Sequence, residues 1–440
     1  MMSARFAARR LLGRCATRPL LALILAVAML HPAEGAQAPN GMPHPVAAPA
    51  ARFLTANLAD CLRLANQRQP RVAAARASLA AAEDGSRALD NLPVPTLLVP
   101  ELAIRRRQAT LGVFAATAAV DQAERETAYA VTRTYFTVLF AREQERVAQS
   151  IVARLGATRD AAQRALDAGA KDVSDTDVKR GLVYLRLAEA KQIEANQGVQ
   201  RALGALREAT GLSPDIVLDV PATRLPDVTV HPTRDTVVAQ ALAHRGELIG
   251  ASIFAEAASL EVKAQRTSLH TRTETFGAGS DIHSFLVPPG MMNSEFRPAG
   301  ISPEMPAILV GLCHDRMKRA QSLALRAQAV TEATSNLIAL EADDAFLRWE
   351  EAWRQIPKAR EAADIGDKMA DDLGKDFAAG LKVRVEEVIS ARLLAAQARA
   401  QYNEYLYRQV LALADLERVT GGAFCARLVE ATAAPPVASR

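Results

Sequence analysis

The stretch AEAKQIEANQGVQRALGALREATG at 188–211 decides the fold, because a related stretch, ARAQYNEYLYRQVLALADLERVTG, stands 210 residues later at 398–421. Eight of the 24 aligned positions are identical, and both stretches end in Thr-Gly. Self-similarity at a fixed spacing indicates that one structural unit is built twice. We therefore expect two related halves.

Each copy also carries an Ala-Gly pair upstream of its Thr-Gly ending, at 168–169 and at 379–380. Glycine is the preferred residue just past a helix end. In the first copy, Ser174 followed by Asp177 has the spacing of a capping box that starts a new helix. We therefore predict that the chain reverses near 169–174 and again near 380–386, with a helix on either side of each turn.

The helices that flank these turns are expected to be very long. Residues 101–213 contain no proline, which is consistent with uninterrupted helices because an interior proline costs about 3 kcal/mol. The second copy contains Pro357, which we expect to kink or interrupt its first arm. The predicted fold class is mainly α, with two related halves that form long antiparallel helical hairpins of α-barrel or coiled-coil type and short, incomplete strand segments.

The first 36 residues have the pattern of a secretory signal peptide: arginines precede an apolar run at 20–30, followed by small residues. A membrane-spanning helix is the weaker alternative, because the run is well short of the roughly 20 residues that a bilayer requires. Cleavage removes five arginines and one glutamate, so the formal charge changes from +4 to +4 − 5 + 1 = 0. A nucleic-acid partner therefore has no electrostatic support.

The remaining chain divides by composition and by the repeat. We predict a flexible leader at 37–52, a first repeat at 53–212 with a short strand region at 91–107, and a linker at 213–232 that carries four prolines. The second repeat covers 233–422 and includes a strand and loop region at 271–312. A disordered tail at 423–440 follows.

Apolar spacing predicts which faces pack. Leu406, Val410, Leu413 and Leu416 recur at the period of a packed helix seam. The aromatic residues of 346–353, Phe346, Trp349 and Trp353, share one helix face and are expected in the core.

No arrangement of residues points to catalysis, so we expect no enzyme, no cofactor and no metal. The histidines are scattered without metal-ligand spacing, and the sequence Cys313-His314-Asp315 is a weak candidate because adjacent residues point in different directions. The mature chain keeps Cys61, Cys313 and Cys425. Small buried side chains are favoured over one disulfide plus a free thiol.

The acidic residues beside the two predicted turns are the better functional candidates. Copy one carries Asp172, Asp175 and Asp177, and copy two carries Glu386 and Glu387. Carboxylates near a helix N-terminus stabilise it by about 0.3–1 kcal/mol, and this role alone is the favoured interpretation. Oligomerisation would instead repeat each acid into a ring.

Several motifs, in this order along the chain, resemble the TolC-like outer membrane efflux proteins. They are Leu54-Thr55 leading to Ala65 and Pro70, the stretch YAVTRTYFTVLFAREQ at 129–144, and the two turns. In the family each turn reads Gly, a few residues, then Asp-Val and a small residue. Here this becomes Gly169 to Asp177-Val178, and Gly380 to Glu387-Val388-Ile389-Ser390-Ala391.

The resemblance implies a homotrimer in the cell outer membrane, with helices that form a periplasmic tunnel and strands that cross the membrane. Substrates would leave passively, driven by an inner-membrane pump that a periplasmic adaptor protein joins to the channel. The turns would form the end that faces the pump. There the resemblance implies a pore constriction at Glu387, Ser390, Glu386, Asp177 and Asp175, with Ser390 in place of a second ring acid. It implies adaptor contacts at Gly169, Ser174, Val178, Gly380 and Val388.

The sequence departs from the family at the membrane end. The region 91–107 has 17 residues, including three prolines and three consecutive arginines. Two membrane-crossing strands of about 9–11 residues and a turn do not fit there. The alternative is therefore a non-conducting periplasmic helical scaffold, or adaptor-binding protein, derived from the same family.

Overall fold

The computed structural model describes residues 52–94, 99–170, 172–222, 224–268, 272–274 and 308–433, all within the unit Ala51–Arg440. The predicted signal peptide, nearly all of the predicted leader and most of the strand and loop region 271–312 lie outside the described residues. No helix in the described ranges is long and apolar enough to cross a membrane.

The described chain is mainly helical, and the same order of helices occurs twice. The first half contains α1 (Leu58–Arg68), α2 (Pro70–Asp90), α3 (Leu102–Asp167) and α4 (Asp175–Ala209). The second half contains α5 (Arg234–His244), α6 (Gly246–Thr267), α7 (Cys313–Ala378) and α8 (Val385–Val419). The lengths are 11, 21, 66 and 35 residues, followed by 11, 22, 66 and 35. The predicted fold class is therefore confirmed.

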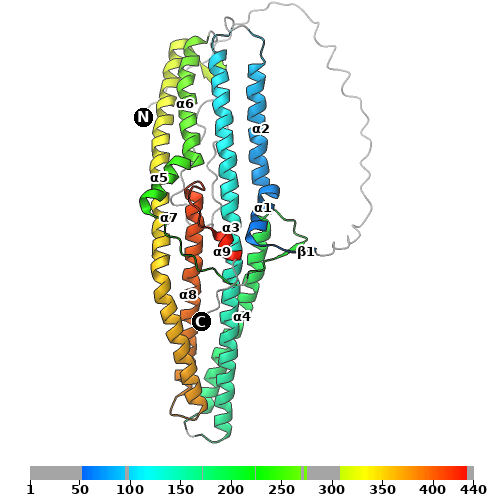
Figure 1. Cartoon of the computed structure of the whole chain (residues 1–440), viewed down its shortest axis with the longest axis vertical. Coiled ribbons are helices and arrows are strands. Elements are labelled where there is room, and N and C mark those ends of the chain that lie inside the picture. The colour runs from blue at the N-terminus through cyan, green and yellow to red at the C-terminus, as the bar shows by residue number, and fades with distance from the viewer. Residues whose placement is uncertain are drawn as a thin grey trace, which may run out of the picture. The chain divides into compact units, whose positions relative to one another are not determined.

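The long helices pack in antiparallel pairs, α3 with α4 and α7 with α8. Figure 1 shows α2 and α4 end to end beside α3, and α6 and α8 end to end beside α7. Helices α2 and α6 contact the N-terminal parts of the long helices, and α3 also contacts α6 and α8. Each half thus places two stacked helices against one continuous helix.

Glycine ends the helices where the chain must reverse. Gly169 and Gly380 have φ values of 74° and 73°, in the left-handed region that side chains other than glycine rarely adopt. After the first turn, the Ser174 side chain caps α4 in a capping box with Asp177, as the spacing predicts. Local sequence chemistry therefore accounts for the first hairpin turn.

The junction between α2 and α4 depends on close backbone contact. The peptide group between Arg68 and Gln69 lies against Gly211, and a side chain at Gly211 would meet the Arg68 carbonyl at 2.9 Å. Gln69, the residue between α1 and α2, donates from Nε2 to the carbonyl oxygens of Glu208 (3.2 Å) and Ala209 (3.1 Å). Two carbonyl oxygens in the last turn of α4, which have no partner within the helix, thereby receive hydrogen bonds from Gln69.

Two small sheets accompany the helices. Strand β1 (Arg52–Thr55) pairs in parallel with β2 (Ile216–Asp219), and β3 (Arg272–Glu274) pairs antiparallel with β4 (Ile308–Val310). Strand β2 lies within the predicted linker 213–232, and its pairing with β1 holds this part of the linker in place. Strands β3 and β4 lie at the two ends of the predicted strand and loop region.

The prediction of strands at 91–107 is wrong for the described part of that region. Helix α2 ends at Asp90 and α3 begins at Leu102, so residues 102–107 are helical. The side chains of the arginine run explain the difference. Arg106 donates to the carbonyl oxygens of Leu89 (3.0 Å), Asp90 (3.1 Å) and Leu92 (3.4 Å), and so closes the end of α2 against the start of α3.

The predicted seam of α8 is buried as expected. Leu406, Val410, Leu413 and Leu416 lie in the main hydrophobic cluster together with Trp349. Trp353, in contrast, is 42% exposed, so its predicted place in the core is wrong. Helix α7 runs through Pro357 without interruption, because its packing against α6 and α8 outweighs the loss of one hydrogen bond.

The C-terminal segment and the cysteines also differ from expectation. The predicted disordered tail contains α9 (Leu428–Ala433), and Leu428 packs in the main hydrophobic cluster. Cys61, Cys313 and Cys425 are all free, which excludes the disulfide alternative. Only Cys61 is buried, so the favoured interpretation holds for that residue and fails for Cys313 and Cys425.

Candidate functional site

The two helix turns lie together at one end of the helices. The turns at 168–174 and 379–384 are adjacent at the lower end of Figure 1, and we call them, with residues 175–184 and 385–390, the tip. A separate hydrophobic cluster joins both hairpins there. It contains Val178 of α4 and Val385 and Ile389 of α8. The fold therefore brings the predicted site residues of the two copies into one region.

The acids of the first copy are occupied by local contacts. Asp177 Oδ2 accepts from the Ser174 backbone N–H at 3.0 Å and from its hydroxyl at 2.6 Å. The hydrogen bonds from Ser174 lower the pKa of Asp177. Asp175 is paired with Lys179 at 2.6 Å. Both carboxylates thus stabilise the start of α4, which is the role that the sequence favoured.

The acids of the second copy divide between two roles. Glu387 accepts a hydrogen bond from the Arg384 backbone N–H at 3.3 Å, so it caps α8 as Asp177 caps α4. Glu386 points to the other hairpin and pairs with Arg180 of α4 at 2.9 Å. Arg180 also lies 3.6 Å from Asp177. The ion pair of Arg180 and Glu386 is therefore a direct polar link between the two halves at the tip.

This link borders a small cavity of about 290 Å³, which we call the tip groove. Two predicted constriction residues, Glu386 and Ser390, line it. Its complete lining is Arg180, Val183, Tyr184, Glu386, Ile389 and Ser390. Val183 is exposed, so the groove combines an apolar wall with a charged rim.

The predicted adaptor-contacting residues differ in their exposure to solvent. Gly169, Ser174 and Gly380 are exposed, whereas Val178 and Val388 are 8% and 0% exposed. The two valines therefore support the turns from inside the hairpins and are unavailable for surface contact. The sequence analysis missed four groove residues as site residues: Arg180, Val183, Tyr184 and Ile389. The available signal for those of α4 was their position within about two turns after Asp177.

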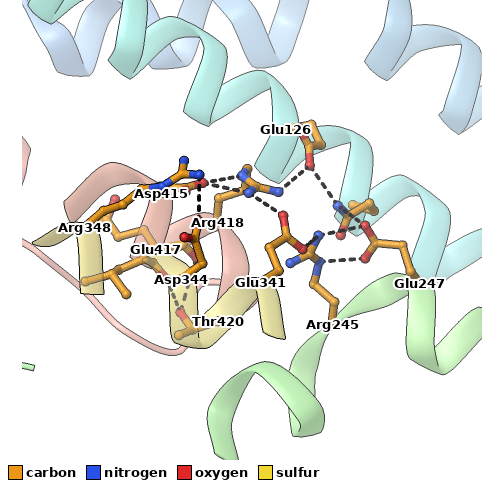
Figure 2. A network of polar contacts seen from close by, with 12 residues as sticks. Glu126, Arg245, Glu247, Glu341, Asp344, Arg348, Asp415, Glu417, Arg418 and Thr420 are labelled. Atoms are coloured by element: carbon orange, nitrogen blue, oxygen red, sulfur yellow. Dashed lines mark hydrogen bonds and ion pairs between the residues drawn. The ribbon is translucent and has the colours of Figure 1, made fainter. Parts of the chain in front are cut away.

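A second group of residues that sequence reasoning missed lies in the interior of α3 and α7 and at the C-terminal end of α8, and Figure 2 shows it from close by. Arg418 of α8 pairs with Glu341 of α7 at 2.6 Å, with Asp415 at 2.7 Å and with Glu126 of α3 at 3.3 Å. Arg245 pairs with Glu341 at 2.9 Å and joins this group, which we call the central ion cluster. Position 418 corresponds to Glu208 in the first copy, so the first copy has no arginine at the equivalent position.

The central ion cluster is buried, yet its arginines keep their charge. Burial acts to lower the pKa of Arg418, but Asp415, Glu341 and Glu126 outweigh it and hold that pKa well above the usual value. A buried charge requires such partners. The cluster joins α3, α7 and α8 at one level.

A third polar group lies at the end of the long helices opposite the tip. Arg105 of α3 pairs with Glu261 of α6, with Nη2 and Oε1 3.1 Å apart. Arg316 of α7 donates from Nε to Gln265 of α6 at 2.9 Å. Arg105 and Arg316 are each the fourth residue of a 66-residue helix. Helices α3 and α7 therefore contact α6 through arginines at equivalent positions.

The described ranges contain no group of three or more His, Cys, Asp or Glu side chains arranged to hold a metal ion. His314 and Asp315 lie in the first turn of α7 beside Cys313, whose thiol donates to the Gln265 carbonyl at 3.4 Å. The polar groups of the tip, the central ion cluster and the α6 contacts are arranged for ion pairing and helix capping.

Solved structures with the same fold identify the architecture. The outer-membrane channel OprN is 16% identical and matches with a TM-score of 0.67 over 85% of this chain and 94% of its own. The MtrE outer membrane channel of Neisseria gonorrhoeae is 17% identical, with a TM-score of 0.64 over 83% and 89%. The outer membrane protein VceC of Vibrio cholerae is 15% identical, with a TM-score of 0.64 over 83% and 96%.

Neither a protein-family model nor a curated protein sequence matches the chain. The likeness is therefore one of three-dimensional structure, with two stacked helices against one long helix in each half. By its structure, the chain matches the TolC-family outer membrane channels over most of its length.

Proposed function

We propose that this protein is the outer-membrane duct of a tripartite efflux or secretion system, a passive conduit coupled to an inner-membrane pump through a periplasmic adaptor protein. The observation that carries the proposal is the match to outer membrane channels over 85% of the chain. The working form would be an assembly in the outer membrane, which we propose to be a homotrimer. The N-terminal 36 residues would direct export.

In this proposal the tip is the end that meets the adaptor and limits the pore. The exposed turns at Gly169, Ser174 and Gly380 supply the contact surface, and the tip groove accepts apolar side chains of the partner. Glu386, Glu387 and Ser390 are exposed on the same helix end, where threefold repetition would place acidic side chains around an axis. A cation-selective constriction follows from such a ring.

Reconstitution tests the conduit. We expect the full mature chain to fractionate with outer membranes and to form ion-conducting channels in planar bilayers. Glu387→Ala should reduce block by divalent cations or alter conductance, while Glu332→Ala, which removes an exposed acid of α7 far from the tip, should leave both unchanged. Recovery of a soluble periplasmic protein that never conducts would contradict the proposal.

A second candidate function has one specific observation in its favour. The connection between α2 and α3 is short, and Arg106 ties its two helix ends together through three carbonyl oxygens. A short connection of this kind leaves little chain for membrane-crossing strands. It therefore favours a periplasmic helical scaffold that binds an adaptor or another envelope protein but conducts nothing. The same fractionation and conductance measurements separate the two functions, since only the duct predicts channels.

A further inference from the structure

A hollow of about 880 Å³ lies between the segment that joins the two halves and helices α7 and α8. We call it the Trp353 hollow. Volumes of this size are typical of small-molecule sites. Its lining residues are Asp227, Val228, Thr229, Trp353, Arg354, Ile356, Pro357, Arg360, Glu361, Asp364, Ile365 and Gln409.

The hollow has an aromatic wall that is held in place from behind. Trp353 is 42% exposed, although it belongs to a cluster of rings. Its ring stacks on Trp349 with centroids 5.9 Å apart, and the His231 ring meets it edge-on at 5.2 Å. A large exposed indole with a fixed orientation offers an electron-rich surface to a cation or an apolar body.

Hydrogen-bond acceptors without partners accompany this wall. Gln409 is 1% exposed and donates from Nε2 to the Val228 carbonyl at 3.0 Å. Its Oε1 atom is buried and has no hydrogen-bond partner among the described residues. Pro357 lies within α7 and has no N–H, so the Trp353 carbonyl lacks its usual helical donor. The guanidinium groups of Arg354 and Arg360 also line the hollow, so its unpaired acceptors stand beside donors that are already engaged in ion pairs.

The charges of the lining leave one carboxylate available. Arg360 is paired with Asp227 at 2.7 Å, Arg354 with Glu350 at 2.6 Å, and Asp364 with Arg399 at 3.1 Å. Glu361 is exposed and forms no ion pair with any residue that the structure describes. The remaining carboxylate, the buried acceptor and the aromatic surface all favour a positively charged donor.

We propose that the Trp353 hollow binds a small organic cation with a primary ammonium group and an apolar body. The ammonium group donates to Glu361 and to Gln409 Oε1, and the apolar body covers Trp353. The Glu361 carboxylate would repel an anion. A neutral apolar molecule would leave Gln409 Oε1 without a hydrogen-bond donor. The site does not depend on conduction, because a scaffold and a duct with this fold both contain it.

The chain has only two tryptophans, Trp349 and Trp353, so its tryptophan emission reports on this hollow. The full mature protein is titrated with phenethylammonium, and with 2-phenylethanol as the neutral match of similar size. We expect a saturable change in emission with the cation, and binding of the alcohol about tenfold weaker. Equal binding of the two probes, or a response to the cation that does not saturate, overturns the proposal.

Two variants address the contacts separately. Glu361→Gln and Gln409→Leu are each expected to weaken phenethylammonium binding about tenfold. The matched control is Glu332→Gln, an exposed glutamate of the same helix, which should bind as the unchanged protein does. Because Glu361 is exposed, Glu361→Gln keeps the fold, and circular dichroism verifies this. Wild-type affinity in Glu361→Gln would show that the cation is bound elsewhere and refute the assignment.

Discussion

The Gly421 backbone lies directly against the carbonyl oxygen of His244, so that a methyl group at Gly421 would stand 2.5 Å from that oxygen. His244 is the last residue of α5, and Gly421 follows the end of α8 with a φ of 63°. The contact is thus the point at which the stacked helices of the second half meet. Gly211 and Arg68 make the equivalent contact in the first half.

Gly421→Ala should therefore destabilise the fold, because the new methyl group clashes with backbone and the left-handed φ disfavours alanine. We expect a loss of roughly 1–3 kcal/mol in the free energy of unfolding, measured by urea denaturation. Gly204→Ala is the matched control. Gly204 lies inside α4 with open space around its Cα, and alanine there should stabilise by about 0.5–1 kcal/mol. Equal effects of the two changes would contradict the close packing at the junction.

The Ser174–Asp177 capping box predicts an acid-sensitive contribution to stability. The folded-state pKa of Asp177 is lowered, so the contribution is present above the unfolded pKa and is lost as pH falls through the folded value. Ser174→Ala should cost about 1 kcal/mol at neutral pH and less in acid, where the hydrogen bond from the Asp177 N–H to Ser174 Oγ remains but the one to the carboxylate is weakened. Thermal melts of both proteins between neutral pH and pH values below the ordinary aspartate range measure this. A difference that does not change with pH would exclude the capping carboxylate as its source.

The central ion cluster predicts a large penalty for removing Arg418, because Glu341 would remain buried without its closest partner. We expect Arg418→Ala to cost about 3–5 kcal/mol, as for other broken buried pairs. Arg408→Ala, which breaks the exposed pair with Glu404 on the same helix, should cost about 1 kcal/mol or less. Chemical denaturation of both variants provides the comparison. Similar losses would mean that Arg418 does not hold the three helices together.

Arg106→Ala should open the end of α2, since three carbonyl oxygens lose the hydrogen bonds that the Arg106 guanidinium donates. Hydrogen exchange of the backbone amides at 86–92 is expected to accelerate by about tenfold, which corresponds to a loss of about 1.4 kcal/mol in local stability. Arg107→Ala is the neighbouring control, because within the described ranges Arg107 forms only an exposed pair with Glu256. Unchanged exchange in Arg106→Ala would show that the α2 end is held by other contacts.

Much of the architecture was predictable from local sequence patterns. The repeat of Thr-Gly endings, the proline-free stretch and the glycine turns specify long helices and their reversals, because they act over a few neighbouring residues. The capping role of Asp177 follows from its spacing to Ser174 in the same way. These features depend on backbone hydrogen bonding within one or two turns of chain.

The remaining features depend on residues that are far apart in the sequence. No local pattern indicated that Arg180 would meet Glu386, or that Arg418 would be buried among carboxylates of three helices, since these contacts join different helices. Tertiary packing also made the Arg105–Arg107 run part of a helix and left Trp353 at the surface. A charge or an aromatic ring is stabilised by whichever groups the folded chain brings to it. The sequence alone therefore specified the helices and turns, and only the tertiary structure decided where the charges pair and where a hollow remains.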